Sequence, residues 1–516
     1  MNKFILWTCL LVLGCGQAAA AQPALDVLIV NARIVDGSGN PWYRGSVAIH
    51  DGRIVALGNA ESLRSTTAKR IVDARDRVVA PGFIDMMGQG TLGYIQDPVV
   101  ALSQLRQGIT THVSGEGWSS APTPADMKPV SIDGEQVRWS TFAEYFRILE
   151  KHGVPLNVAF NVGAEQVRRV VLGDKDVDPT PAQLDRMKQL VEQAMLDGAH
   201  GISSALIYPP GAYAETPELI ELAKIVARHG GFYSTHLRNE TAGLLGAIDE
   251  TLQIAREAKI PVHIYHLKAS GKKNWPLMEQ ALAKITAARA SGLDVTTDIY
   301  PYIRHGNGLD SFLPPTFFEK GHEAARKQLA NRKVRQQLRA EIERVDSDWE
   351  NTYQAIGADF DKVLVTGSDN KSAIGLSIAQ VARRDKRDVW DTFFDLVQAD
   401  TGIAPESMSE AQKVLAMRAP FVMFDTDNGP TNPAKAESTH PRTFGSFPRV
   451  LAKYVREDGV ISLEEAIRRM TSLAANRIGA FDRGRIAVGM AADLVIFDPA
   501  AVRDLATFEK PLQYAV

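Results

Sequence analysis

The segments Ser234–Glu240 (STHLRNE) and Ile264–Ala269 (IYHLKA) each place a histidine at the end of a short apolar run. A helix-like stretch separates the two histidines, His236 and His266. In a barrel of parallel strands, successive strands end at the same face, so side chains at their C-terminal ends converge. Imidazole is a common zinc ligand, and two imidazoles with a carboxylate leave a position for a reactive water. The pair therefore predicts a metal site at the mouth of a parallel barrel.

The middle of the chain alternates apolar runs with amphipathic stretches. The apolar runs lie at Ile84 and at residues 109–113, 158–162, 201–207, 232–235, 262–265, 295–299 and 422–424. Between them, Ala182–Met195 and Leu219–His229 are examples with the spacing of helices. Roughly eight strand–helix units predict a (β/α)₈ TIM-like barrel over residues 81–478. A long charged stretch of helix formers, about 319–417, predicts an insertion before the last barrel strand, as a lid or cap.

Short β-like runs punctuated by glycine occur at both ends of the chain. They lie at residues 26–30, 46–50 and 53–57 and again at 484–487 and 492–497. Two distant segments of similar character predict one small β-sandwich domain, built from residues 22–80 and 479–516.

The composition is that of an ordinary soluble globular protein, with 45% hydrophobic and 23% charged residues among 516. This length accommodates one large barrel and an accessory domain. A formal net charge of -3 provides no basic field for nucleic acid, so that class of partner is excluded. We expect a small-molecule substrate, and the sequence leaves the oligomeric state open.

The N-terminus has the pattern of an export signal. Lys3 provides the positive end, Phe4–Leu13 a short apolar core, and Ala18–Ala21 a small-residue cleavage site. We therefore expect residues 1–21 to be removed from a periplasmic or secreted protein. Both cysteines, Cys9 and Cys15, lie in this segment, and the alternative is a lipid anchor on Cys15. No later stretch is long and apolar enough for a transmembrane helix.

Several longer motifs share one family pattern. They are Val79–Asp85 (VAPGFID), Gly201–Gly211 (GISSALIYPPG), the two histidine segments, Asp298–Tyr302 (DIYPY), His440–Gly445 (HPRTFG) and Ala491–Val495 (AADLV). Through them the chain resembles the amidohydrolase superfamily and, within it, the N-acyl-D-amino-acid deacylases (D-aminoacylases). The resemblance covers nearly the whole mature chain. It implies a metal-dependent barrel hydrolase.

The chain departs from this family pattern on the first barrel strand. Members usually carry a His-x-His pair after Gly-Phe-Ile-Asp, and the corresponding positions here are Met87 and Gln89. Methionine and neutral glutamine are poor zinc ligands beside oxygen and nitrogen donors. The subsite built by that pair is therefore expected to be absent. D-aminoacylases resemble one another in relying on one tightly held zinc at the second subsite, so we expect one Zn²⁺ per chain.

A second departure concerns the third metal ligand. The deacylases typically carry a cysteine in a Gly-Asn-Cys-Gly context, where this chain has Gly115–Trp118 (GEGW). The carboxylate of Glu116 would replace the thiolate and complete a ligand set with His236 and His266. The alternative is that Glu116 is a solvated loop residue. His112 is a lesser candidate, and we expect it to pack in the core.

The resemblance places the catalytic aspartate at Asp427. A carboxylate beside an activated water can take its proton and return it to the leaving nitrogen, acting first as general base and then as general acid. Asp425 is the rival, because an alignment shifted by two residues keeps the same face of the strand.

Recognition of a substrate carboxylate needs cations or hydrogen-bond donors. The residues that match the family's carboxylate site are Lys268 and Arg442, and those that match its hydroxyl donors are Tyr208 and Tyr300. The alternative for the two cations is a structural ion pair. Arg238–Glu240 could also line the pocket. The remaining histidines considered are expected to be structural: His50, His152, His200, His229, His263 and His322.

The reaction implied is hydrolysis of the amide of an N-acyl-D-amino acid to a carboxylate and a free D-amino acid. One alternative keeps the fold and the metal but makes the enzyme a dipeptidase or another amidase. Another is a non-catalytic binding protein that inherited the fold. The missing His-x-His pair favours this last reading, whereas the other retained site residues disfavour it.

Overall fold

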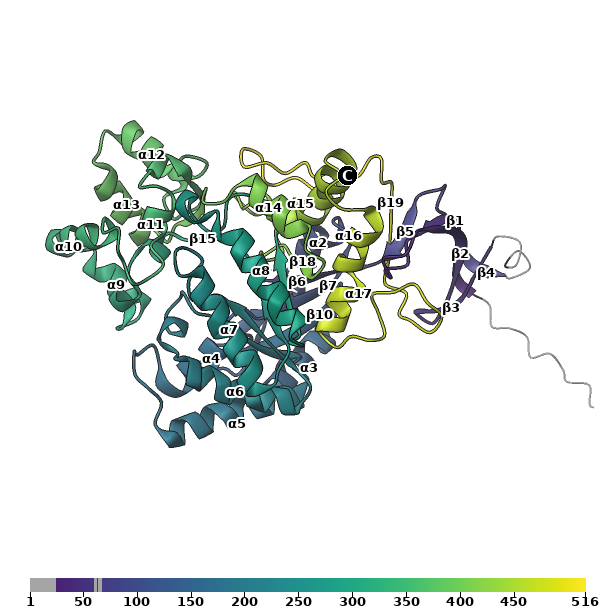
Figure 1. Ribbon diagram of the computed structural model, residues 1–516, viewed down its shortest axis with the longest axis horizontal. Helices are drawn as coiled ribbons and strands as arrows, with labels where there is room; N and C mark the ends of the chain where they lie inside the picture. Colours follow the sequence, from purple (N-terminus) through teal and green to yellow (C-terminus); the bar gives the residue numbers. More distant parts are fainter. Residues whose placement is uncertain (1–24, 60–62, 64–66) are drawn as a thin grey trace, which may run out of the picture.

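The structure is a computed structural model that describes residues 25–59, 63 and 67–516. The expected signal segment, residues 1–21, and both cysteines lie outside the described residues. Three parts follow one another across the view in Figure 1: an insertion on the left, a barrel in the middle and a small β domain on the right. Among the described helices, none has the length and apolar character needed to cross a membrane.

The central part is an eight-stranded parallel sheet that closes almost completely into a barrel. Its strands are β6 (Phe83–Gly88), β7 (Ile109–Ser114), β10 (Asn157–Gly163), β11 (Gly201–Ala205), β12 (Phe232–His236), β13 (Val262–Ile264), β14 (Val295–Ile299) and β18 (Val422–Phe424). Neighbours in the sheet follow this chain order. A parallel bridge from Gly88 to Asn428 joins the first strand to the segment after the last. Each strand lies where its apolar run predicts it, so the predicted (β/α)₈ barrel is confirmed.

Helices cover the outside of the barrel. They are α3 (Phe142–His152), α4 (Ala164–Leu172), α5 (Pro181–Asp197), α6 (Thr216–Arg228), α7 (Leu244–Ala258), α8 (Leu277–Ala290), α14 (Glu410–Met417), α15 (Arg442–Arg449), α16 (Leu463–Met470) and α17 (Ser472–Arg477). Helix α5 shows why such a segment folds locally. Thr180 and Gln183 form a reciprocal capping box at its start, and Gly198 takes the left-handed conformation that ends it.

The small β domain combines both ends of the described chain. Its strands are β1 (Leu25–Ile34), β2 (Tyr43–His50), β3 (Arg53–Gly58), β4 (Ala68–Asp73), β5 (Val78–Pro81) and β19 (Leu494–Phe497). Antiparallel pairing of β19 with β5 joins the two ends. Residues 484–487 do not form the expected strand. Instead the buried Ile486 packs into this domain's core, and its N–H donates to the carbonyl of Asp36.

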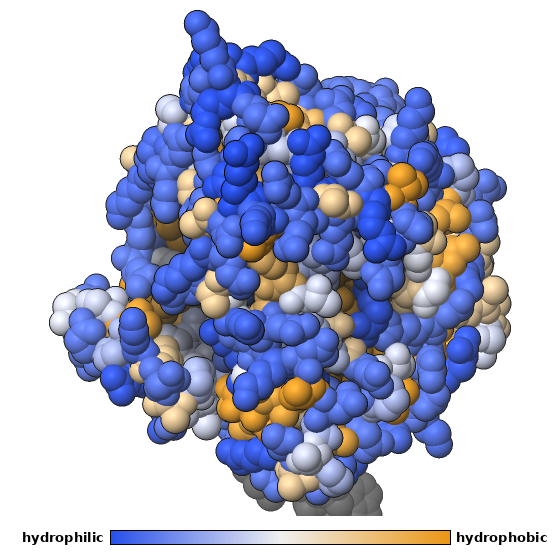
Figure 2. Space-filling view, turned by 90° about the vertical axis from the view of Figure 1, so that its left-hand side faces the viewer, coloured by the Kyte–Doolittle hydropathy of each residue, from blue (hydrophilic) through white to orange (hydrophobic). Residues whose placement is uncertain are grey.

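The insertion between β14 and β18 has a hydrophobic core of its own, which runs from Leu309 to Ile403. It contains β15 (Asn307–Gly308), β16 (Val363–Gly367), β17 (Gly402–Pro405), α9 (His322–Gln328), α10 (Arg332–Ile342), α11 (Thr352–Ala355), α12 (Ile378–Asp385) and α13 (Val389–Gln398). The expected bounds of about 319–417 therefore lie too far toward the C-terminus, because Ala416 and Met417 pack in the barrel core. Figure 2 shows the face of the molecule that lies at the left of Figure 1. This face is largely hydrophilic and carries separate hydrophobic groups.

Candidate active site

Three side chains at the C-terminal end of the barrel form a cluster suited to a metal ion. Glu116 follows β7, His236 ends β12 and His266 follows β13. One ligand atom of each lies within 4.8 Å of the others. His236 and His266 are 5% and 2% exposed, so neither is a solvated surface residue. The sequence expectation that Glu116 lies beside both histidines agrees with this arrangement.

The donor atoms of this cluster face one another. Oε1 of Glu116 lies 3.0 Å from Nδ1 of His236 and 3.4 Å from Nε2 of His266. Two imidazoles and one carboxylate form a donor set that zinc uses in catalytic sites, where a fourth position is open to water. The residues present therefore fit a divalent cation. Nδ1 of His236, Nε2 of His266 and Oε1 of Glu116 are the atoms that would hold it.

Glu240 lies behind both histidines. Its Oε1 is 3.2 Å from Nδ1 of His266, and its Oε2 is 3.6 Å from Nε2 of His236. A carboxylate on the outer nitrogen of a ligand histidine fixes the ring and its tautomer. Glu240 was expected only as a possible pocket residue. Its position four residues after His236, in the same quoted segment, was the sequence signal for this role.

Lys268 is held by the same carboxylate. Its Nζ lies 2.6 Å from Oε1 of Glu240 and 2.8 Å from Nδ1 of His266. In this structure Lys268 therefore forms the ion pair that the sequence left open as an alternative to substrate binding. Lys268 also lines the cavity beside the metal cluster.

The electrostatics of the cluster follow from these contacts. Burial alone would raise the pKa of Glu116, but its hydrogen bonds to His236 and His266 outweigh burial and hold the pKa below its usual value. Burial and the Lys268 charge oppose protonation of His266, yet Glu240 and Glu116 raise its pKa to about 9. Burial lowers the pKa of His236. The carboxylates of Glu116 and Glu240 therefore favour positive charge at this cluster, as a proton on His266 or as a bound cation.

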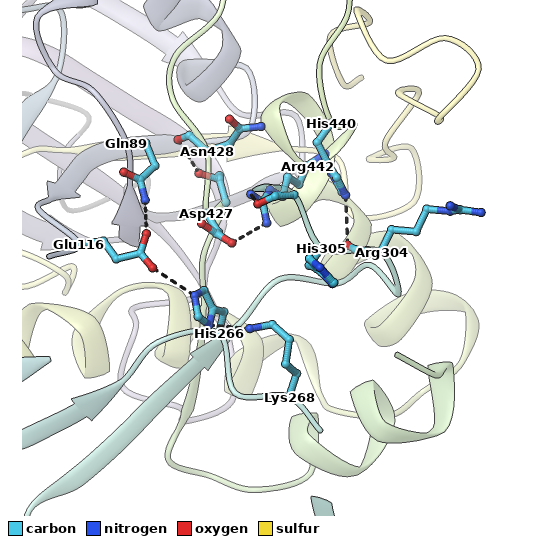
Figure 3. Close-up of polar contacts among 12 residues, drawn as sticks. Gln89, Glu116, His266, Lys268, Arg304, His305, Asp427, Asn428, His440 and Arg442 are labelled. Atoms are coloured by element: carbon cyan, nitrogen blue, oxygen red, sulfur yellow. Dashed lines mark hydrogen bonds and ion pairs between the residues drawn. The ribbon is translucent and has the colours of Figure 1, made fainter. Parts of the chain in front are cut away.

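Asp427 lies across the cavity from the metal cluster. Its Oδ2 accepts from Nη1 of Arg442 at 2.5 Å, and Figure 3 shows the two side chains pointing toward each other. Burial raises the pKa of Asp427, while the Arg442 charge acts in the opposite direction. The rival residue, Asp425, is fully buried and is absent from the cavity wall that the described residues form. This geometry favours Asp427 as the residue that meets substrate.

Two backbone positions in the site are strained. His266 has φ of 35° and Asp427 has φ of 43°, both in the left-handed region that residues other than glycine rarely occupy. Such conformations persist where the surrounding structure over-determines them, and they gather at functional sites. The two residues face the same cavity from β13 and from the segment after β18.

The cavity between these groups has a volume of about 310 Å³. Tyr208 and Tyr300 both line it, as the family pattern implies. The Tyr208 ring stands edge-on to His236 at 5.4 Å, and the Arg442 guanidinium lies 4.8 Å from the centre of the Tyr300 ring. Oη of Tyr300 and Nε of Arg442 are buried and have no hydrogen-bond partner among the described residues. Both atoms can donate a hydrogen bond.

The end of β6 carries the two residues that depart from the family's His-x-His pattern. Met87 is buried, at 2% exposure, and lies outside the cavity lining formed by the described residues. Gln89 lines the cavity, and its Nε2 donates to Oε2 of Glu116 at 2.7 Å. Figure 3 shows Glu116 between Gln89 and His266. Sequence reasoning identified Gln89 as a lost ligand and missed this contact.

Two other histidines near the site are structural, as expected. His112 is fully buried and its Nδ1 lies 2.9 Å from the Tyr94 hydroxyl. His263 is also fully buried and lies 2.8 Å from both Thr296 and Asp298. Neither side chain lines the cavity formed by the described residues.

A second cavity of about 420 Å³ adjoins the first. The two share Ile207, Tyr208 and Glu350, and the insertion supplies much of the second wall. Glu350 accepts a hydrogen bond from the main-chain N–H of Glu240 at 2.5 Å, and burial raises its pKa to about 8. Nothing in the charged sequence around Glu350 distinguished it from solvated residues, so sequence reasoning missed it.

The chain is similar to known amidohydrolases along most of its length. Residues 70–515 match the amidohydrolase family. The chain is 33% identical over 501 residues to a D-aminoacylase of Alcaligenes xylosoxydans xylosoxydans, covering 96% of this chain and 92% of that protein. A solved N-acyl-D-glutamate deacylase from Bordetella bronchiseptica, complexed with zinc and a phosphonate inhibitor, is 31% identical with a TM-score of 0.80, covering 96% of this chain and 94% of that one.

A solved D-aminoacylase, described for one-metal activation and second-metal attenuation, is 30% identical with a TM-score of 0.77. That alignment covers 95% of this chain and 94% of the D-aminoacylase. The family match thus spans the barrel and the insertion, and from the small β domain it includes most of β4 with β5 and β19. Together with the barrel and its metal-binding cluster, it shows that this chain is a hydrolase that belongs to the amidohydrolase family.

Proposed function

We propose that the protein hydrolyses the amide bond of N-acyl-D-amino acids and uses one zinc ion held by Glu116, His236 and His266. The observation that carries this proposal is the placement of those three ligands opposite the Asp427–Arg442 pair across one cavity. The relatives named as D-aminoacylase and N-acyl-D-glutamate deacylase support the substrate class.

The metal would lower the pKa of a water molecule and polarise the scissile carbonyl. The protein's own contribution to proton transfer is Asp427. Its ion pair with Arg442 engages Oδ2 and leaves Oδ1 to accept the proton of the attacking water. Because burial raises the pKa of Asp427, this carboxyl holds a proton more readily than an ordinary aspartate and can pass it to the leaving nitrogen.

The hydrogen-bond donors and cations that line the same cavity would bind the substrate's α-carboxylate. Arg442 and Tyr300 each present a buried donor that lacks a partner among the described residues. Lys268 adds a positive charge even while Glu240 holds its ammonium group. Since a buried donor without a partner destabilises the free protein, satisfying these donors favours a carboxylate-bearing ligand.

The direct test is a panel of matched N-acetyl-D- and N-acetyl-L-amino acids given to the zinc-loaded protein, with release of free amine as the readout. We expect the D-series to be cleaved, and the metal-depleted protein to be inactive until zinc is restored. Cleavage of neither series by the metal-loaded protein would favour the binding-protein alternative. Equal cleavage of both series would contradict the proposed D-selectivity.

The second cavity favours a further candidate substrate, a dipeptide with a free amino group. Five acidic residues line this cavity: Asp176, Asp310, Glu341, Asp348 and Glu350. Burial raises the pKa of Glu350 to about 8, and Asp310 lies beside His322 and Arg326, so the negative charge comes from the other three. The cavity's arginines are already paired, Arg238 with Glu250 and Arg344 with Asp346. An ammonium group on the acyl part would meet this negative charge. Comparing glycyl-D-leucine with N-acetyl-D-leucine distinguishes the two substrates, because only the dipeptide carries that group.

We also propose that the protein is exported to the periplasm or beyond the cell after cleavage near Gln22. The charged, apolar and small-residue pattern of the first residues supports this. N-terminal sequencing of the mature protein tests it. A product that begins at a diacylated Cys15 would favour the lipid-anchored alternative.

A further inference from the structure

We propose that Gln89 is a positioning residue that makes Glu116 a one-oxygen ligand of the metal. This inference rests on the metal site of the proposed function. The residue stands where the family pattern has a metal-binding histidine, and it supports a ligand in place of being one.

The geometry divides the two oxygens of Glu116 between two tasks. Oε2 accepts the Gln89 amide hydrogen at 2.7 Å, while Oε1 faces Nδ1 of His236 at 3.0 Å and Nε2 of His266 at 3.4 Å. The donor must be the amide nitrogen of Gln89, because an ionised carboxylate only accepts hydrogen bonds. Oε1 is therefore the oxygen presented to a cation.

Gln89 is itself held at the seam that closes the barrel, which we define as the contacts of Gly88 and Gln89 with Asn428. Its main-chain N–H donates to the carbonyl of Asn428 at 3.1 Å, next to the bridge between Gly88 and Asn428. The main chain of Gln89, from which the side chain extends, is therefore held in place by the contact with Asn428. A side chain anchored in this way can orient Glu116 without rearrangement when a cation enters.

The consequence concerns the number of metal positions that Glu116 occupies. A carboxylate without an outer partner can bind a cation through both oxygens and fill one more position. With Oε2 committed to Gln89, Glu116 fills a single position and leaves another open for water, as catalytic zinc sites require. The same hydrogen bond withholds Oε2 from a second cation, so the Gln89–Glu116 pair favours a one-metal site.

Two substitutions separate the donor from the shape of the side chain. Gln89→Met keeps the length and removes the donor, whereas Gln89→Glu keeps the shape and replaces the donor by an acceptor. The matched control is Gln96→Met, because Gln96 is an exposed residue whose amide donates to the Ser131 carbonyl, away from the cavity. Circular dichroism and thermal unfolding establish that each variant is folded.

The readouts are zinc affinity by chelator competition, metal content, and the visible absorption of the Co²⁺-substituted protein, whose intensity falls as coordination number rises. In Gln89→Met we expect a weaker cobalt band and a loss of zinc affinity of about 10–100-fold. In Gln89→Glu we expect metal content to rise above one per chain, because two adjacent carboxylates attract a second cation. Gln96→Met should match the parent in all three readouts.

Unchanged cobalt absorption and zinc affinity in Gln89→Met would overturn the proposal, as would the same losses in Gln96→Met. None of these readouts requires turnover, so they separate the inference from the proposed reaction. A parent protein that binds metal and cleaves no amide contradicts the reaction and leaves the role of Gln89 standing. A parent protein that binds no metal contradicts both.

Discussion

The ends of β12 and β13 and the end of β6 face the same side of one barrel but do different work. β12 and β13 deliver His236 and His266, whose nitrogens converge on Glu116. β6 delivers the buried Met87 and the hydrogen-bond donor Gln89. The difference teaches that a strand end in this fold can supply a ligand or can orient a ligand supplied by its neighbour. Substitutions at the two places should therefore differ in kind.

Replacing a ligand histidine should have the largest effect. We expect His266→Ala to abolish zinc binding and with it activity, because only two of the three donors remain. Met87→Ala is the matched control from β6, a buried side chain that lies near the site and binds nothing there. It should keep its metal and be less stable by about 2–5 kcal/mol. Elemental analysis and thermal unfolding measure both, and retention of full zinc by His266→Ala contradicts the ligand assignment.

The next largest loss of activity is expected at Asp427, because this residue is proposed to transfer the proton and is not expected to hold the metal. Asp427→Asn should keep fold and zinc and lose about 10²–10⁴-fold in turnover. The control is Asp425→Asn. Burial and the nearby carboxylates raise the pKa of Asp425 well above its usual value, which favours its neutral form, and a neutral amide resembles that form. Steady-state kinetics with zinc content measured in parallel decide this, and equal losses in both variants would remove the distinction.

A smaller effect should follow from Glu240, which supports the histidines as Gln89 supports Glu116. Glu240→Gln should lower zinc affinity by about 10–100-fold while leaving one metal at saturation. The physical reason is that Nδ1 of His266 loses a charged acceptor and Nε2 of His236 loses a nearby negative charge. Chelator competition measures it. An unchanged affinity would mean that the rings are oriented by packing alone.

The smallest effect near neutral pH concerns the acid limb of the activity profile. Asp427 must be ionised to accept a proton, and burial raises its pKa above the ordinary 3.8. Activity should therefore fall as pH decreases through this raised pKa, at a higher pH than for a solvated aspartate. The residual activity of Asp427→Asn should lack this limb. A profile of kcat against pH at saturating zinc tests both points.

The sequence predicts the barrel well because its strands are short apolar runs, and burial on both faces imposes that pattern whatever the partner residues are. It also predicts that His236 and His266 meet, because strand ends of a parallel barrel converge. The expectation that Glu116 joins them comes from the resemblance to the deacylases, which carry a cysteine at that place. The contacts of Lys268 and Gln89 depend on which way a long polar side chain turns. That direction is set by partners distant in sequence, such as Glu116 for Gln89, and no local pattern contains it.

The boundaries of the insertion show the same limit at larger scale. Helix formers and charge resume in α14 after the short strand β17, so composition does not mark where the insertion ends. The structure separates them by what they bury, since Ala416 and Met417 face the barrel while Ile403 belongs to the insertion's own core. The sequence likewise could not predict the irregular conformation at Ile486, because a buried apolar residue gives the same sequence pattern in an irregular segment as in a strand.

The seam that closes the barrel joins parts of the chain that are far apart in sequence. Gln89 touches Asn428 through its main chain and Glu116 through its side chain, and Asn428 directly follows Asp427. A local opening between β6 and β18 would therefore loosen Glu116 and displace Asp427 in one event. Amide hydrogen exchange at this seam should slow when the metal binds, which makes the closure of the barrel a reporter of the state of its active site.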